Sequence, residues 1–553
     1  MLLLTREKVF YSFALIMAWI FFVYVLVNSA WVTEDAFITF RSVLNFVNGY
    51  GPVWNIGERV QVFTHPLWFL LLSITKWMTG YLVYAALFLS MFFALASIFI
   101  LQFLSMRRWI GLTLIIMLAT SRAFIEYSSS GLENSLAAFI LGSFCWVLFY
   151  RPVLWRLVFL ASLLALCRMD LILFVLPTLL YSCWYRRKTA NQWLFSAILA
   201  ALPFCTWLLF SLIYYGSFFP NTYYAKLPDG FSHLEFFKQA FNYFQDSATE
   251  DPSTLLLIVS GSLIGIIAGD TQVRLLVFGE ILYLGYIVWI GGDYMTGRFF
   301  MVPAYVGAML LARCAKLQLW IFALLTCLSI VLSLQTKAPI MSNIVPKTNF
   351  IAFSSLNIIN ERANWWPQNS WLGKESTLHA AEALGNNWHY TGSSCAIPML
   401  AVGGAGLTAG PNIHIVDFLG ITDPLLARLP ASNFFPGHFS RKVPKGYMSS
   451  LNTGNNVIAD PKVAALYERV REIVKGPLWT ARRWHYIMDL LGGKWRGSVA
   501  RYDQNGELTT EVPAAFLMSS HWAQLLNRSV LAENNVEIAA ARRDICLEQW
   551  DYQ

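Results

Sequence analysis

Long apolar runs alternate with short polar segments along the first 335 residues of the chain. A helix that spans a bilayer needs about 20 mostly apolar residues. The run over residues 9–30 has this length, and Asn28 sits where a signal-peptide cleavage site would need small residues, so we predict an uncleaved helix. With the later runs the pattern predicts about eleven crossings. The later runs cover residues 81–104, 109–127, 133–150, 155–168, 171–185, 192–214, 254–270, 275–291, 298–312 and 318–335.

Positive charge predicts the orientation of these helices, because Lys and Arg are retained on the cytoplasmic side of short loops. The N-terminus, with Arg6 and Lys8, is therefore expected in the cytoplasm, and everything after about residue 336 outside it. The other basic clusters lie between runs, at Arg107/Arg108, Arg151/Arg156, Arg186/Arg187/Lys188 and Arg313/Lys316.

One apolar stretch, "THPLWFLLLSITKWM", does not fit as a further crossing. It is short, and a crossing here would move every later basic cluster to the wrong side of the membrane. We therefore interpret residues 64–78 as a half-helix or re-entrant segment, which is tolerated where it packs against protein.

The composition changes after residue 335. Gly, Pro, Asn, His and charged residues become common, and no apolar run approaches membrane length. The stretches "KESTLHAAEALGNN" and "VAALYERVREIVKG" have helical spacing, and "IHIVDFLG" is typical of a buried strand. The predicted fold is thus a polytopic α-helical membrane domain over 1–335, with a first external loop at 31–65, and an extracytoplasmic α/β or α+β globular domain over 336–553.

The overall composition supports the membrane class. Hydrophobic residues make up 57% of the 553 residues, aromatic residues 16% and charged residues only 13%. The net charge of +8 does not indicate nucleic acid, because the basic residues flank apolar runs and do not form one patch.

Cysteine usage agrees with this division. Most cysteines lie in or beside the apolar runs, where a buried thiol behaves as a small hydrophobe. Cys395 and Cys546 stand alone in the exported part, where an oxidising compartment would allow them to form a disulfide.

The conspicuous polar residues of the membrane region are predicted to share the non-cytoplasmic side, and acidic groups near an apolar core are often functional. A shared polar cleft would combine carboxylate bases with cationic phosphate ligands, the groups needed for transfer from a lipid phosphate. Aromatic faces would contact sugar rings and isoprenoid tails. The residues are Glu34, Asp35, Glu133, Arg168, Asp170, Asn221, Tyr223, Tyr224, Lys226, Asp293 and Arg298.

Glu34 and Asp35 open an amphipathic segment. One helical face would carry Asp35, Thr39, Ser42 and Asn45 and the other face apolar residues, so we expect a helix along the membrane interface. Acids in a first helical turn also favour the positive end of the helix, and this capping role alone would explain the pair.

The motifs around this segment favour a catalytic role for the two acids over helix capping. "EDAFITFR", "NGYGPVWNIGERV" and "THPLW" resemble the opening loop of bacterial GT-C glycosyltransferases of the arabinofuranosyltransferase type. "GLENSL", "PNTYYAKL", "GGDYMTGRFF" and, in the tail, "VDFLGITDPLLARL" with "PGH" extend the resemblance over most of the chain. The family implies a polyprenyl-phosphate-linked arabinofuranose donor and an active site outside the cytoplasm.

The resemblance also implies roles for matching residues. Asp35 is the expected catalytic base and Glu34 its neighbour, while Arg41 closes the motif and is expected to contact the donor. Lys226 and Arg298 are expected at the donor phosphate and the other matching residues at the sugar, whereas the tail residues Asp417, Asp423 and His438 are expected in acceptor binding or, more simply, in shaping the domain. The chain departs from the family pattern at Gln61 and His65, which leaves the acceptor in question.

Several alternatives stay open at this level. Glu34, Asp35 and Asp293 offer oxygen ligands that would suit Mg²⁺ or Ca²⁺, although a monophosphate donor does not require a cofactor. A lipid-linked-glycan polymerase, ligase or flippase is the main alternative function. The expected location is the bacterial inner membrane, in contact with membrane lipid, and the acceptor is either a protein such as pilin or a glycan.

Overall fold

The structure is a computed structural model. It is mostly helical. It describes residues 2–226, 231–314, 317–336, 356, 358–373, 376–393, 395–399, 402–431 and 434–494.

Each predicted apolar run contains a helix. Within the part of the chain that the structure describes, four of these helices are long and apolar enough to cross a membrane, and a fifth span results if α12 and α13 count as one bent helix. Others have only 13 to 17 residues, short for a hydrocarbon core of about 30 Å. The chain is a polytopic helical membrane protein, and the number of crossings stays a prediction. The helices are α1 (Leu2–Asn28), α4 (Val83–Leu104), α5 (Arg108–Thr120), α7 (Asn134–Tyr150), α8 (Leu154–Cys167), α9 (Ile172–Tyr185), α10 (Ala190–Tyr215), α13 (Pro252–Ala268), α14 (Thr271–Ile290), α15 (Met301–Arg313) and α16 (Leu319–Gln335).

The chain folds as two compact units, each built from separate stretches of sequence. The first unit comprises the described parts of Met1–Thr33, Ala86–Cys205 and His233–Ser376. The second comprises those of Glu34–Ala85, Thr206–Ser232 and Thr377–Gln553. The boundary predicted at residue 335 separates the membrane-spanning part of the sequence from the rest, and these contacts do not test that property. The compact units instead group the first loop with the tail.

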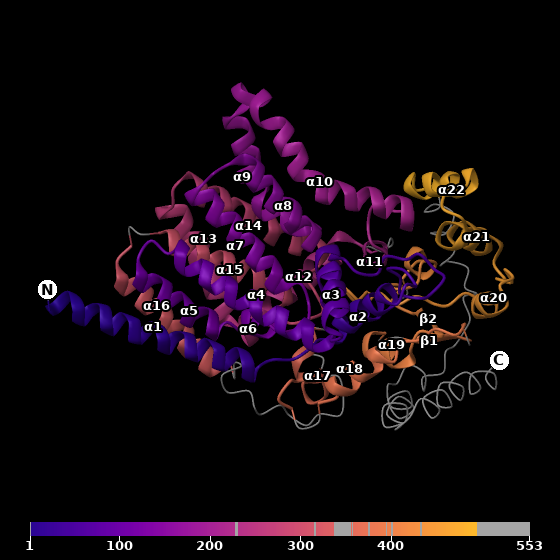
Figure 1. Cartoon of the computed structure of the whole chain (residues 1–553), viewed down its shortest axis with the longest axis horizontal. Coiled ribbons are helices and arrows are strands. Elements are labelled where there is room, and N and C mark those ends of the chain that lie inside the picture. The colour runs from indigo at the N-terminus through magenta and orange to yellow at the C-terminus, as the bar shows by residue number, and fades with distance from the viewer. Residues whose placement is uncertain are drawn as a thin grey trace. The chain divides into compact units, whose positions relative to one another are not determined.

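The first unit is a helical bundle. Within it α13 packs on α15, α9 on α14, α7 on α8, and both α1 and α16 on α5 (Figure 1). The backbones of α13 and α15 meet at Gly261 and Gly307, where a Cβ added to Gly261 would lie 2.5 Å from the Gly307 Cα. Only glycine allows this approach.

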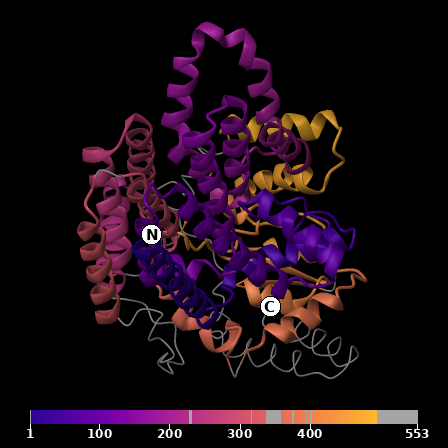
Figure 2. The same ribbon diagram turned by 60° about the vertical axis from the view of Figure 1, so that its left-hand side comes forward.

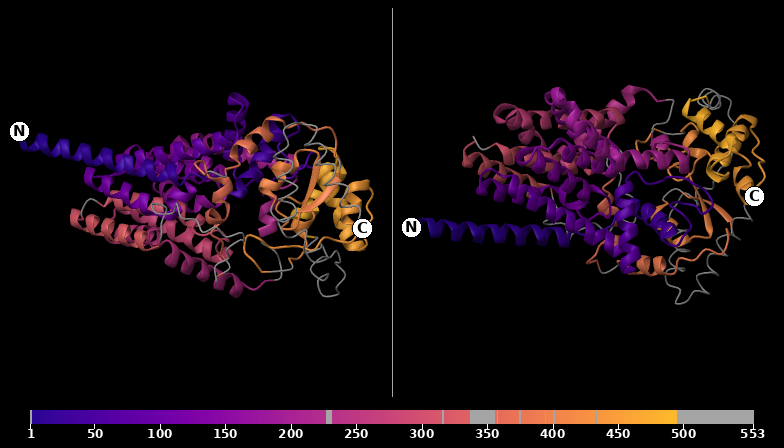
Figure 3. Two further views of the ribbon diagram at one scale, coloured as in Figure 1. Left: turned by 90° about the horizontal axis from the view of Figure 1, so that it is seen from below. Right: turned by 45° about the horizontal axis from the view of Figure 1, so that its top comes forward.

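Shorter elements complete the first unit. α6 (Arg122–Tyr127) continues after α5, and α12 (His233–Glu250), which the sequence pattern did not predict, meets α13 at a bend of 108°. The end of α9 and the start of α10 form a hairpin that stands out from the unit (Figure 2), and the start of α1 projects from it (Figure 3). The remaining elements are η1 (Met169–Leu171), η2 (Arg187–Thr189), η3 (Arg298–Phe300) and α17 (Glu361–Asn369).

The second unit combines helices with a two-stranded parallel sheet. β1 (Cys395–Met399) pairs with β2 (Ile413–Asp417) in a register that runs from Cys395↔Ile413 to Met399↔Asp417. α19 (Gly403–Ala409) connects the two strands and packs on α2. The other elements are α2 (Glu34–Val47), α3 (Pro66–Thr79), α11 (Asn221–Lys226), α18 (Leu378–Asn386), η4 (Leu426–Arg428), α20 (Tyr447–Thr453), α21 (Pro461–Lys475) and α22 (Ala481–Leu491).

Local predictions in the second unit are confirmed. β2 lies in the predicted strand, and α18 and α21 lie in the two predicted helical stretches. The segment 64–78 lies mostly in α3 (Pro66–Thr79), which is followed by Gly80 in the left-handed conformation. α3 has 14 residues and is not among the helices long enough to span a membrane; whether it crosses stays a prediction.

The exposed polar face predicted for α2 is wrong. Every residue from Ala36 to Asn45 is buried, so Thr39, Ser42 and Asn45 do not face water or lipid headgroups, and on the predicted polar face only Asp35, in the first turn, is half-buried. The polar side chains instead bind protein groups, many of them far away in the sequence, that a pattern within the helix does not reveal.

Candidate active site

Glu34 and Asp35 lie in the first turn of α2, where the helix dipole favours acidic side chains. The Gly404 N–H donates a hydrogen bond of 3.1 Å to Oε1 of Glu34. Burial, together with the charge of Asp35, raises the pKa of Glu34 to about 8. Glu34 therefore holds a proton at neutral pH.

The contact between α2 and α19 depends on a glycine. A Cβ added to Gly403 would overlap the carbonyl oxygen of Glu34 and lie 2.6 Å from its Oε1. A Cβ added to Gly404 would meet nothing within 4 Å. The absence of a side chain at Gly403 thus lets the tail approach the acid pair.

The polar face of α2 continues one turn later. Thr39 Oγ1 lies 2.8 Å from Nε2 of His65, the residue that precedes α3. Both side chains are buried. His65, one of the two departures from the family pattern, thus contacts the helix that carries Asp35.

Arg41 is fully buried and binds backbone carbonyl groups. It donates hydrogen bonds to Trp54 (3.0 Å), Ile413 (2.9 Å) and Gly406. Its guanidinium also lies over the ring of Trp54. These contacts join α2 to the first loop and to the tail, and they favour a structural role for Arg41 over the predicted contact with the donor.

The "PNTYYAK" and "ITDPLLARL" motifs bind one another within the second unit. The amide nitrogen of Asn221 donates to the carbonyls of Gly420 (2.8 Å), Ile421 (3.1 Å) and Asp423 (3.0 Å). Its oxygen accepts a hydrogen bond of 3.1 Å from Arg428. Asn221 therefore holds the tail loop in place, which favours a structural role over the predicted sugar contact.

The tail acids accept backbone hydrogen bonds. Asp417 accepts from the N–H groups of Leu419 and Thr422, and Asp423 accepts from those of Leu425 and Leu426. Burial raises the pKa of Asp417 to about 6 and that of Asp423 to about 7. These contacts favour the structural role of the two acids, and the choice between their two predicted roles stays a prediction.

The aromatic and cationic residues of α11 differ in exposure. The Tyr223 ring is exposed and stacks on Phe219 at 4.7 Å. Tyr224 is half-buried beneath Arg428, and its hydroxyl lies 2.8 Å from that of Ser217. Lys226 is half-buried. Of the two tyrosines, Tyr223 leaves its ring more available for a ligand. In the tail, His438 is half-buried beside Phe435.

In the first unit, Glu133, Arg168 and Asp170 lie together where α7 begins and α8 ends. Arg168 binds Asp170 through two hydrogen bonds of 3.1 and 2.5 Å, and its Nε lies 3.9 Å from Oε1 of Glu133. The guanidinium also lies over the ring of Phe299 and 3.5 Å from the Tyr283 hydroxyl. Two acids and an aromatic face thus surround this cation.

Asp293 and Arg298, from "GGDYMTGRFF", form a looser pair in the same unit. Oδ2 of Asp293 lies 3.7 Å from Nη1 of Arg298, and its Oδ1 accepts a hydrogen bond from the Tyr294 N–H. The Tyr243 hydroxyl accepts from the Phe299 N–H at 3.0 Å and so fixes the segment that carries Arg298. The distance leaves Arg298 less tightly engaged by Asp293 than Arg168 is by Asp170.

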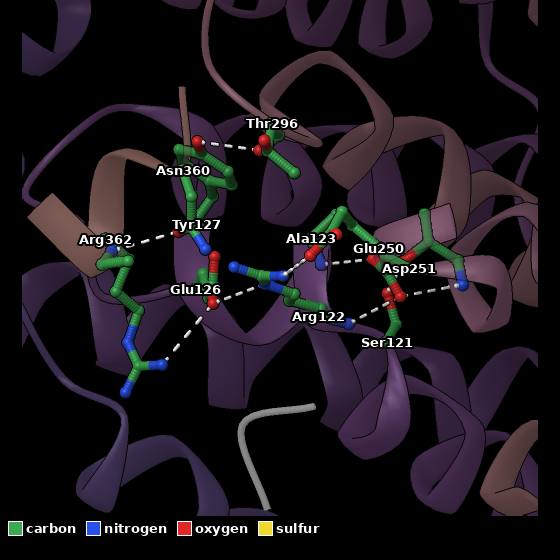
Figure 4. A network of polar contacts seen from close by, with 12 residues as sticks. Ser121, Arg122, Ala123, Glu126, Tyr127, Glu250, Asp251, Thr296, Asn360 and Arg362 are labelled. Carbon is green, nitrogen blue, oxygen red and sulfur yellow. Dashed lines mark hydrogen bonds and ion pairs between the residues drawn. The ribbon is translucent and has the colours of Figure 1, made fainter. Parts of the chain in front are cut away.

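Sequence reasoning missed a further buried ionic network (Figure 4). Arg122 binds Glu126 at 2.9 Å and Glu250 at 3.2 Å, and Arg362 lies 3.5 Å from Glu126. Beside this network, Asp251 accepts hydrogen bonds from the N–H groups of Arg122 and Ala123, the first two residues of α6. The only signal was the "RAFIEY" pair of opposite charges at helical spacing, which the sequence interpretation placed inside a membrane span.

The metal and disulfide predictions stay predictions. Within the described ranges, no three or more His, Cys, Asp or Glu side chains are grouped so that they could hold a metal ion. Cys395, at the start of β1, is disulfide-bonded. Its predicted partner Cys546 lies outside the described residues.

These helices and side chains define a polytopic helical membrane protein with clusters of acidic and basic groups at the ends of apolar helices. The chain is similar to two curated proteins, both of them terminal β-(1→2)-arabinofuranosyltransferases. The one from Mycobacterium tuberculosis (strain ATCC 25618 / H37Rv) is 26% identical over 320 residues, which is 50% of this chain and 51% of the relative. The one from Corynebacterium glutamicum is 26% identical over 336 residues, which is 50% of this chain and 46% of the relative.

The similarity confirms the resemblance to arabinofuranosyltransferases that the motifs predict. Both of these relatives of the chain are glycosyltransferases. The chain spans about half the length of the curated relatives it matches. No family model and no solved structure matches it.

Proposed function

We propose that this protein is a membrane glycosyltransferase that transfers D-arabinofuranose from a polyprenyl-phosphate donor to an acceptor outside the cytoplasm. The observation that carries the proposal is its similarity to two arabinofuranosyltransferases over half of the chain. The location proposed is the bacterial inner membrane, and the acceptor is a protein such as pilin or a glycan.

Asp35 is the proposed general base. Glu34 beside it holds a proton at neutral pH, because burial raises its pKa to about 8, and a protonated carboxyl cannot accept another proton. Asp35 is only half-buried, so an acceptor hydroxyl could reach it. The hydroxyl proton would pass to Asp35 as the acceptor oxygen forms its bond to the anomeric carbon.

The bond from the anomeric carbon to the phosphate oxygen breaks in the same step, and polyprenyl phosphate leaves as an anion. Arginine and lysine side chains can stabilise such an anion. Lys226 and Arg298 are the cations that the family motifs assign to the donor phosphate, and Lys226 belongs to the same compact unit as Asp35.

A direct assay tests this function. Purified full-length protein in lipid nanodiscs would receive synthetic polyprenyl-phosphoryl arabinofuranose with either a pilin substrate or an arabinan oligosaccharide. We expect labelled sugar on one acceptor and release of polyprenyl phosphate, with or without a metal chelator. Transfer only from a pyrophosphate-linked donor, or movement of the lipid-linked sugar across the bilayer without transfer, would instead support a polymerase, a ligase or a flippase.

A further inference from the structure

The last described helix, α22, exposes an apolar stripe. Trp484, Met488 and Leu491 are spaced by four and three residues and so lie on one helical face. Trp479, just before the helix, is 72% exposed and stacks on Trp484 at a centroid distance of 6.4 Å, while Met488 is 63% exposed. An exposed stripe of this kind marks an interaction surface.

The opposite face of α22 fixes the helix to its own unit. Ile487 is fully buried, and so is Arg483. Arg483 donates hydrogen bonds to the carbonyls of Ile473 (2.9 Å), Leu478 (3.2 Å) and Tyr214 (3.1 Å). The stripe therefore has a defined orientation.

Tyr214 connects this helix to the membrane. It is the penultimate residue of α10, whose stretch Trp193–Tyr215 is one of the four helices long and apolar enough to cross a bilayer. Gly216, which follows α10, packs against Ile473 and Ile487, so the turn after the span enters the contact between α21 and α22. α22 thus lies beside the end of a membrane span, at the level where Trp and Tyr side chains gather in membrane proteins.

Basic side chains border the stripe. Arg482, His485 and Lys494 are all more than 60% exposed. Each has an acidic neighbour: Arg482 lies 4.0 Å from Glu472, whereas the buried Asp489 pairs with Lys494 at 2.7 Å and with His485 at 3.5 Å. An apolar stripe with a basic border is complementary to anionic lipid headgroups above acyl chains.

We propose that α22 and Trp479 form a membrane-interface anchor, which inserts the stripe Trp479, Trp484, Met488 and Leu491 into the lipid surface around the end of α10. The continuity with the span and the charge of the border favour lipid over a protein occupant. The anchor would hold the second unit at the bilayer surface, and it does not depend on the proposed transferase activity.

A depth measurement tests the anchor. Met488→Cys would carry an environment-sensitive fluorophore in a full-length chain whose exposed thiols Cys205 and Cys327 are replaced by serine. In nanodiscs that contain quencher-labelled phospholipid, we expect the emission to be at least about twofold lower than in unlabelled nanodiscs. The matched control is Lys462→Cys, an exposed position at the other end of α21, where we expect no quenching.

Two results would overturn the anchor. Blue-shifted emission at residue 488 without lipid quenching would mean that protein covers the stripe, whether residues 495–553 or another chain. Red-shifted emission without quenching would mean that the stripe faces water. Leu491→Cys gives a second probe of the same face if labelling at residue 488 disturbs the fold.

Discussion

The protonation of Glu34 depends on what surrounds its carboxyl group. Burial raises the pKa of Glu34 from an ordinary value of 4.5 to about 8. In the folded state Glu34 keeps a proton that the unfolded chain loses above about pH 4.5. The free energy of unfolding should therefore fall as the pH rises from about 4.5 to about 8.

Glu34→Gln should remove this part of the pH dependence, because glutamine is neutral throughout. We expect the variant to match the wild type near pH 5 and to gain thermal stability relative to it near pH 8.5, as measured by thermal unfolding in detergent. Glu468→Gln, a surface control, should leave the wild-type dependence unchanged. Identical pH profiles for Glu34→Gln and wild type would contradict the raised pKa.

At the scale of elements, the contact of α2 with α19 can be tested by comparing alanine substitutions of two neighbouring glycines, Gly403 and Gly404. Gly403→Ala would place a methyl group on the Glu34 carbonyl oxygen, and such overpacking typically costs about 1–3 kcal/mol. We expect a lower melting temperature and weaker transfer. Gly404→Ala fills open space and keeps the N–H that binds Glu34, so it should change little. Equal behaviour of the two variants would show that α19 does not hold the acid pair.

Elements with a strong local pattern could be predicted, and their partners could not. Apolar runs predicted the long helices, and alternating or helical spacing predicted β2, α18 and α21. The polar face of α2 was assigned to the membrane surface because nothing nearby indicates that Arg41 binds the carbonyl of Ile413. α12 escaped prediction because its amphipathic sequence contains no membrane-length apolar run.

The candidate site, too, could be predicted from the sequence only in part. The motifs selected the candidate residues, and Arg168 with Asp170 lie close together because only Met169 separates them in the chain. The structural role of Asn221 could not be predicted, because its three carbonyl partners are about 200 residues away in the sequence.

At the scale of the whole molecule, the division into two compact units predicts that the tail is not stable as an isolated fragment. The tail shares a compact unit with Glu34–Ala85 and Thr206–Ser232. Glu58 binds Lys475 at 3.1 Å, and Glu382 accepts hydrogen bonds from the N–H groups of Leu82 and Val83. We expect a fragment of residues 336–553 to lack a cooperative thermal transition by circular dichroism, whereas the full chain has one. A sharp, reversible transition of the isolated fragment would contradict this expectation.

The measurement closest to the proposed chemistry compares two neutral isosteres at neighbouring positions. Asp35→Asn removes the proposed base, and general base catalysis typically contributes about 10²–10⁴-fold in rate. Glu34→Gln replaces a group that is already neutral at pH 7. In the donor assay at pH 7, the predicted result is a loss of at least about 100-fold for Asp35→Asn and a rate near wild type for Glu34→Gln. Transfer by Asp35→Asn at the wild-type rate, or an equal loss in both variants, would contradict the assignment of Asp35 as the base.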